Sequence, residues 1–129
     1  VAGENAEVTF IDRYGSPPLG RALSDAIVEI HAGQGSRVRY VALQEFGEGV
    51  THLAVQRARV GKDAALKTLG VAFGASLARA EVEALLAEDG GSSEMLGVYF
   101  GDAEQHIGGE SRAATLRRLP ASVILGNRL

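Results

Sequence analysis

The sequence contains no cysteine and no tryptophan, and only three of its 129 residues are proline. Without cysteine, these residues can form neither a disulfide framework nor a thiolate metal ligand or cysteine nucleophile. No apolar run approaches the roughly 20 residues of a membrane-spanning helix, and the first residues lack the regions of a signal peptide. The net charge is -3, with acids and bases interspersed. The sequence therefore predicts neither a nucleic-acid surface nor a polybasic membrane anchor.

Glycine, in contrast, is abundant. The chain has 17 glycines, and its 46% hydrophobic content includes few aromatics, which make up 5% of residues. So many aliphatic side chains argue against disorder and favour frequent tight turns around a thin aliphatic core. The chain begins with valine, and we expect it to be a piece of a longer protein.

A short phrase of the form Gly-x-x-(Ala/Ser)-x-(Val/Leu/Met) occurs four times, at intervals of 28 to 30 residues. Its glycines and small residues are Gly3 with Ala6, Gly33 with Ser36, Gly61 with Ala64, and Gly90 with Ser93. Between the phrases an aromatic residue precedes a glycine, at Tyr14, Phe46, Phe73 and Phe100. A fixed period with two turn marks per unit is typical of a solenoid.

The repeat predicts an all-β fold, a parallel β-helix of about four to five coils with two strands per coil. We expect residues 1–129 to form a single core domain, with a fifth coil beginning at residues 123–129. The glycines of the phrase should supply positive-φ corners, and the four aromatics should stack as one ladder that fills the core. A β-sandwich with similarly spaced turns remains an alternative.

Alternation of apolar and polar residues predicts individual strands. In residues 37–46, Val38, Tyr40 and Ala42 share one face. Residues 51–60 should return with Leu53 and Val55 inward. The Ala, Glu and Leu content of residues 77–89 favours a helix locally, but the segment alternates and occupies the return-strand position, so we predict a strand.

The sequence contains none of the common catalytic or nucleotide-binding motifs. Two turns place a carboxylate near a histidine: Glu48 with His52, and Asp102 and Glu104 with His106. Such groups could bind a metal or transfer a proton, but we interpret them, and His31, as solvated turns beside strand-end histidines. His106 is the one candidate metal ligand, and we predict no catalytic or cofactor-binding residues. Arg57, Arg59 and the pair Arg117-Arg118 are interpreted as charged gatekeepers on strand surfaces.

Residues 51–112 resemble the core of the SufB/SufD family of the Suf iron–sulfur cluster assembly machinery. The family's GxYxxxxxQHxxxxT stretch is matched by Gly97, Tyr99, Gln105 and His106, with Ser111 near the threonine position. The closing VILGNRL resembles the family's Val-Phe-Asn-Gly-basic stretch, with Leu125 where Phe or Asn is expected. The resemblance extends over most of the chain from about Ser24 onward.

The resemblance implies a right-handed β-helix in a cytoplasmic complex with a SufB-like subunit and the SufC ATPase. The absence of cysteine favours a SufD-like role, because SufB-like proteins use cysteine to handle sulfur and clusters. The family's cluster-associated histidine and ATPase-binding helices lie beyond Leu129, so they are not assigned to residues of this chain.

We therefore expect a non-enzymatic scaffold that binds no cofactor itself, with the iron–sulfur cluster held at the level of the complex. A homodimer is also left open, and neither nucleic acid nor membrane is expected as a partner. Two alternatives belong to other classes: a carbohydrate-binding or carbohydrate-active β-helix, and a self-polymerising structural β-helix.

Overall fold

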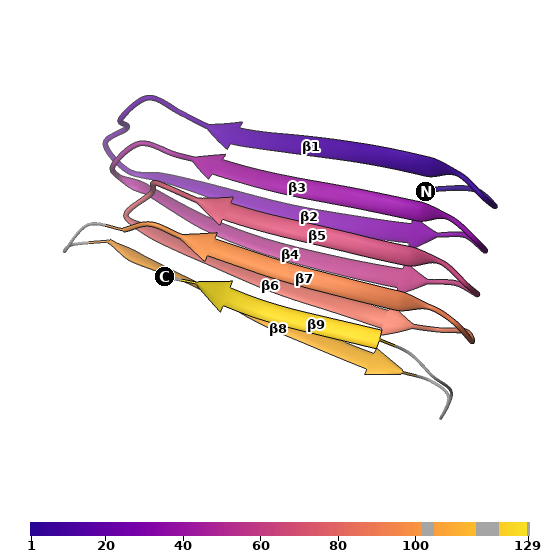
Figure 1. Ribbon diagram of the computed structural model, residues 1–129. Helices are drawn as coiled ribbons and strands as arrows, with labels where there is room; N and C mark the ends of the chain where they lie inside the picture. The colour runs from indigo at the N-terminus through magenta and orange to yellow at the C-terminus, as the bar shows by residue number, and fades with distance from the viewer. Residues whose placement is uncertain (102–104, 116–121, 129) are drawn as a thin grey trace.

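The strands wind into a tube made of two facing sheets (Figure 1). The computed structural model describes residues 1–101, 105–115 and 122–128. Within these residues no helix occurs, and hence none that is long and apolar enough to cross a membrane. The described strands are β1 (Glu7–Gly15), β2 (Ala22–Ala32), β3 (Arg37–Glu45), β4 (Val50–Val60), β5 (Ala65–Ala72), β6 (Leu77–Leu86), β7 (Ser92–Tyr99), β8 (His106–Thr115) and β9 (Ser122–Arg128).

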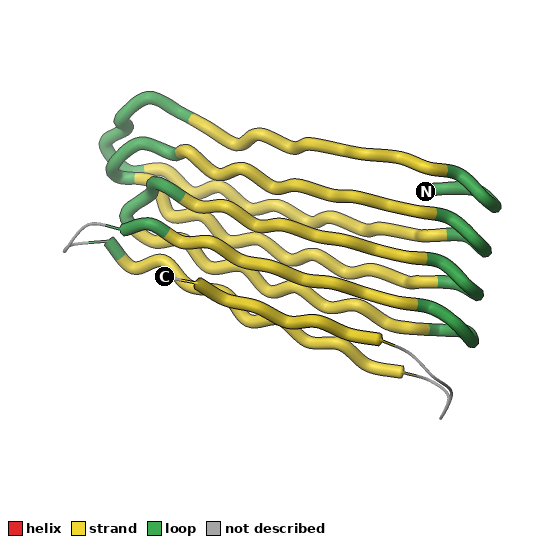
Figure 2. Tube along the Cα trace, in the orientation of Figure 1, coloured by secondary structure: helices red, strands yellow, loops and turns green. Residues whose placement is uncertain are grey.

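Each strand pairs in parallel with the strand two places along the chain. One sheet has the order β1-β3-β5-β7-β9 and the other β2-β4-β6-β8, and Figure 2 shows the connecting turns along the two edges of the tube. This confirms the parallel β-solenoid with two strands per coil, and β9 begins the fifth coil. The pairing excludes the β-sandwich alternative, because β1 bonds to β3 and not to an antiparallel neighbour.

The segment with helix-favouring composition is strand β6, as predicted. Residues from Leu77 to Leu86 pair with β4 on one side and with β8 on the other. Two ladders of backbone hydrogen bonds and an inward row of small and aliphatic side chains together outweigh the weak local preference for helix. In this segment, then, position in the repeat decides the structure.

The corner beside the phrase is built differently from our prediction. The positive-φ residue is Asn5, Gly35, Asp63 and Gly90 in successive coils. The prediction that Gly3, Gly33 and Gly61 supply this conformation is therefore wrong. Gly33 is needed for a different reason: a Cβ there would lie 2.8 Å from the backbone oxygen of Ala2 in the coil before it.

The fourth phrase is also displaced from its predicted register. Ser93 pairs with Leu66, and Met95 pairs with Thr68. The phrase predicts that Met95 pairs with Leu66, but Ser93 pairs with Leu66 instead. The fourth phrase is therefore shifted by two residues along the coil. The same shift places Gly91 level with Ala64 of the third coil and Gly90 level with Asp63. Asp63 and Gly90, which both have positive φ, therefore form the same corner in successive coils.

The core is a thin layer between the sheets, and its largest fully buried side chains include Leu66, Leu86, Met95, Val50 and Val60. In β4 the inward row contains the buried Ala58 and Val60, so alternation also turns His52 and Gln56 inward. The prediction that Leu53 and Val55 point inward is therefore wrong, and Leu53 is 39% exposed on the outer face.

The four aromatics do not form one ladder. In the parallel ladders, Tyr14 and Ala72 both pair with Gln44. Phe73 follows Ala72, so it lies one residue further along the coil, on the outward-facing row. A shift of one residue moves a side chain to the other face of a sheet. Phe73 and Phe100 stack outside the tube with ring centroids 5.1 Å apart, and are 47% and 52% exposed. They do not fill the core as predicted.

Candidate functional site

His52 lies inside the tube. It is the third residue of β4 and pairs with Ser24 of β2, so both side chains face inward from adjacent coils. The His52 Nδ1 atom is 3.0 Å from Ser24 Oγ, and the rings of Tyr14 and Phe46 lie 5.5 and 4.9 Å away by centroid. His52 is only 5% exposed, so its interpretation as part of a solvated turn is wrong.

The surroundings of His52 favour its neutral form. Burial lowers the pKa of His52 below its ordinary value of 6.5, while a hydrogen bond with the Ser24 backbone and the nearby Asp25 carboxylate oppose this effect. A neutral imidazole enclosed by two aromatic rings cannot exchange protons readily with a dissolved substrate. We therefore assign His52 a packing role.

This protonation state should make stability depend on pH. The unfolded chain binds a proton at His52 below about pH 6.5, before the folded protein does, because the folded pKa is lower. The His52 contribution is complete above pH 6.5 and is lost as pH falls toward the folded pKa, by at most about 1.4 kcal/mol per pH unit. Urea unfolding measures this at pH 8 and pH 5.5. Between these pH values, the free energy of unfolding should fall less in His52→Gln than in wild type. His31→Gln, at an exposed position, is the control. If it weakened the pH dependence of the free energy of unfolding as much as His52→Gln, the assignment would be contradicted.

A second polar group occupies the first coil. Asp12 Oδ2 accepts hydrogen bonds from the hydroxyls of Tyr40 at 2.7 Å and Tyr14 at 3.3 Å. Burial, reinforced by Asp12, raises the pKa of the Tyr40 hydroxyl well above its ordinary value, and burial also raises that of Tyr14. Both phenols therefore remain protonated donors. The arrangement joins β1 to β3 and stabilises the first coil.

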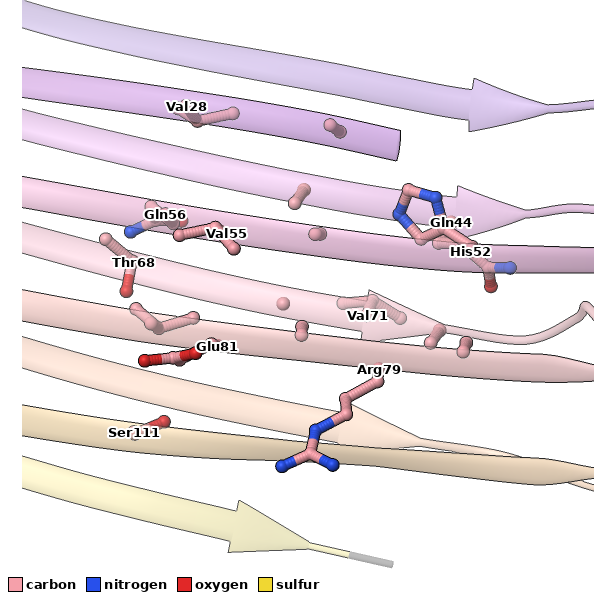
Figure 3. Close-up of a pocket in the computed structure, with 18 of the residues that line it drawn as sticks. Val28, Gln44, His52, Val55, Gln56, Thr68, Val71, Arg79, Glu81 and Ser111 are labelled. Atoms are coloured by element: carbon pink, nitrogen blue, oxygen red, sulfur yellow. The ribbon is translucent and has the colours of Figure 1, made fainter. Parts of the chain in front are cut away.

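A cavity of about 80 Å³ lies between the sheets (Figure 3). Small side chains create it, because Ala42 and Gly70 lie on one sheet and Ala54 and Ala80 on the other. Small-molecule sites usually enclose about 300–1,000 Å³. This space is too small for an ordinary metabolite and suits buried water, which needs roughly 10–15 Å³ of such space per molecule.

Two glutamine side chains flank this cavity. Figure 3 shows Gln56 on one side of the lining and Gln44 beside His52 on the other. Gln44 Oε1 accepts a hydrogen bond from the Gly74 amide at 3.2 Å. Within the described part of the chain, the Nε2 atoms of both glutamines are buried without a hydrogen-bond partner. Neither glutamine carries a charge or is a strong metal ligand, so these two side chains supply neither an acid nor a base to the cavity.

The other sequence candidates lie on the surface. His106 is exposed at the first position of β8, His31 is exposed on β2, and Glu48 is exposed in the turn before β4. Asp102, Glu104 and the pair Arg117-Arg118 lie outside the described residues. Across residues 1–101, 105–115 and 122–128, no three His, Asp or Glu side chains are grouped to hold a metal ion.

The charged gatekeeper interpretation agrees with the surroundings of Arg57. Its Nη1 lies 2.8 Å from Glu83 Oε2 of the next coil, on the outer face of the four-stranded sheet. Arg59 is exposed on the same face. Arg57 therefore contacts a residue of the neighbouring strand, and neither arginine is among the residues that line the interior cavity.

Comparison with known proteins connects this tube to one family. Residues 1–119 match the family model described as SUF system FeS cluster assembly, SufBD core domain. The chain is 34% identical over 85 residues to an iron-sulfur cluster assembly SufBD family protein of Mycobacterium tuberculosis and 33% identical over 85 residues to one of Mycobacterium leprae. Each alignment covers 66% of this chain and 21% of the relative, so the chain spans about a fifth of the length of these curated relatives. No solved structure matches the chain.

Proposed function

Because the chain belongs to the SufBD core-domain family of the SUF iron–sulfur cluster assembly system, we propose that it is a scaffold segment of a Suf-type assembly complex. The match over residues 1–119 is the observation that carries this proposal. In it, the chain catalyses no reaction itself. The iron–sulfur cluster is the cargo of the complex, and the chain acts through the proteins that it holds.

The geometry suits a rigid support. Every described strand bonds along at least one side to a neighbouring coil, and exposed ion pairs cross between coils. One of them joins Lys67 Nζ to Glu94 Oε2 at 2.9 Å. Each exposed pair contributes little, about 0.2–1 kcal/mol, so the backbone ladders and the buried core supply most of the rigidity. A tube of this kind would keep partner-binding surfaces in fixed register.

The proposed partners are a SufB-like subunit and a SufC-type ATPase, in the cytoplasm. A SufD-like role is favoured because residues 1–129 contain no cysteine that could accept sulfur or ligate a cluster. Because His52 is buried and the interior cavity is small, we expect partners to bind the outside of the tube. In this scheme, chemistry occurs on partner subunits and this chain determines their placement.

Co-purification tests the proposal. The full-length protein that contains residues 1–129 is tagged and expressed with the SufB-like and SufC-type proteins of the same organism, with an unrelated β-solenoid of similar length as the control. We expect the full-length protein to retain both partners through size-exclusion chromatography and the control to retain neither. If the full-length protein binds neither partner, the scaffold role in a Suf complex is wrong.

A further inference from the structure

The outer face of the β1-β3-β5-β7-β9 sheet has a continuous apolar surface. The strand register aligns outward positions of successive coils, so like residues stack in rows across the strands. We call this surface the apolar face. Its members are Ile11, Val41 and Leu43, Leu69, Val71 and Phe73, and Leu96, Val98 and Phe100.

Solvent reaches much of this face. Ile11 is 65% exposed, Leu96 is 41% exposed, and the stacked Phe73 and Phe100 form one end of it. The outer face of the four-stranded sheet differs, because charged residues such as Asp25, Arg79 and Glu81 interrupt its apolar positions. Parallel sheets are usually covered on both faces, and contiguous exposed apolar patches commonly mark interaction sites.

Charged residues border the apolar face on both sides: the Arg13–Glu45 pair lies toward the ends of the strands, and a larger group lies toward their starts. Arg39 Nη1 lies 2.9 Å from Glu7 Oε1, and Lys67 pairs with Glu94. Arg37 pairs in the ladder with Glu7 and adds a further exposed cation. With three cations and two carboxylates, the border toward the strand starts has a small positive excess. It would favour a partner that carries carboxylates along one flank.

The size of the face argues against a dimer formed by two copies of it. Four strands about 4.8 Å apart span roughly 14 Å, and three outward positions span roughly 13 Å along each strand. With its side chains, the face presents on the order of 400 Å², whereas a stable protein interface buries about 800 Å² on each partner. A narrower element fits better.

An α-helix has suitable dimensions. Its diameter with side chains is about 10–12 Å and its pitch is 5.4 Å, close to the spacing of about 4.8 Å between neighbouring strands. A helix lying across the strands would place about one apolar side chain per turn against each coil. Three to four turns would cover the row Ile11, Val41, Leu69 and Leu96, with one flank beside Arg39 and Lys67 and the other toward Phe73.

We propose that the apolar face docks one amphipathic α-helix of a partner protein, with apolar residues at positions i, i+3 or i+4, and i+7, and with carboxylates on one flank. This goes beyond the scaffold role, because it specifies which surface is used and what it recognises. It also stands independently of whether the partner is a Suf subunit. Failure of the Suf co-purification would therefore not contradict this inference. Failure of the docking test would likewise not contradict the scaffold role.

Site-specific photocrosslinking tests the docking surface. Benzoylphenylalanine replaces Val41 in the full-length protein in its own cells, and adducts are mapped by peptide mass spectrometry. The matched control position is Arg57, outward on the opposite sheet. We expect adducts from position 41, above those from position 57, that map to an amphipathic helical segment of another protein. Adducts to a second copy, to the same chain or to a non-helical segment, or none above the control, would overturn the proposal.

A charge inserted into the face provides the second test. Leu69→Lys places an ammonium group in the middle row, and the adduct yield from position 41 should fall at least tenfold. Leu53→Lys, on the outer face of the other sheet, should leave the yield unchanged. Circular dichroism melting of both variants shows whether the tube is intact. An unchanged yield in an intact Leu69→Lys variant would overturn the assignment.

Discussion

Replacing Leu66 by alanine is expected to lower the free energy of unfolding by about 2–5 kcal/mol. Leu66 is 1% exposed and belongs to the main core cluster with Val38, Val60 and Met95. Its backbone is held between β3 and β7. Because these ladders hold the backbone of β5 in its sheet, and the hydrogen-bonded turns at both ends tie the two sheets together, the sheets cannot easily collapse into the space left by the missing side chain. The loss would be a large part of a typical domain stability of 5–15 kcal/mol.

Leu96→Ala is the matched control for this prediction. It removes the same atoms from the same sheet, but at an outward position that is 41% exposed. We expect a loss below about 1 kcal/mol, since less apolar surface returns to water. Urea unfolding followed by circular dichroism measures both variants. Equal losses would contradict the assignment of the core to the space between the sheets.

The repeat was sufficient to predict the architecture. Four phrases at nearly constant spacing require units that stack, and a second turn in each unit requires two strands. The same reasoning identified β6 correctly, although its composition favours a helix. Here the sequence signal is strong because a solenoid imposes the same geometric demand on every coil.

The direction of individual side chains was harder to predict. Hydrophobicity suggested that Leu53 and Val55 of β4 point inward, yet the structure turns His52 and Gln56 inward. Counting back from Val60 and Ala58 would have given the correct face, because strand alternation has a period of two. The error came from treating polar residues as outward. Their partners, such as Ser24 for His52, lie about 28 residues away and are not evident from a local pattern.

The interior cavity could not be predicted for the same reason, because local sequence patterns do not give the register between strands. Ala42, Gly70, Ala54 and Ala80 come from four strands, and only the register shows that they share one cavity. Likewise, Phe73 and Tyr14 look equivalent in sequence but differ by one residue in register, which places them on opposite faces. The apolar face could have been recognised from the alternating Val41, Leu43, Leu69 and Val71, once their strands were known to stack.

Gly49→Ala is expected to cost about 2–4 kcal/mol, since it combines two separate penalties. Gly49 has φ = 86°, in the left-handed region, where an L-residue is disfavoured by roughly 1–2 kcal/mol. A Cβ there would also collide with the backbone oxygens of Leu19 and Gly20 in the coil before it. The turn cannot simply move away. Gly49 O accepts a hydrogen bond from Ala22 N at 3.1 Å, and Gly49 N donates to Ser76 Oγ at 2.9 Å.

Gly20→Ala is the control, because its Cβ would meet no atom within 4 Å and its φ lies outside the left-handed region. We expect a change within about 0.5 kcal/mol of wild type, which is usual for surface substitutions. Thermal and urea unfolding of both variants decide the outcome. A Gly49→Ala protein as stable as Gly20→Ala would mean that neighbouring turns are not in backbone contact, and that the coils are held together by their strands alone. A loss larger than the roughly 1–2 kcal/mol of the positive-φ penalty would instead show that the turns of successive coils are in close backbone contact, so that glycine at this corner is also a requirement of the coil spacing.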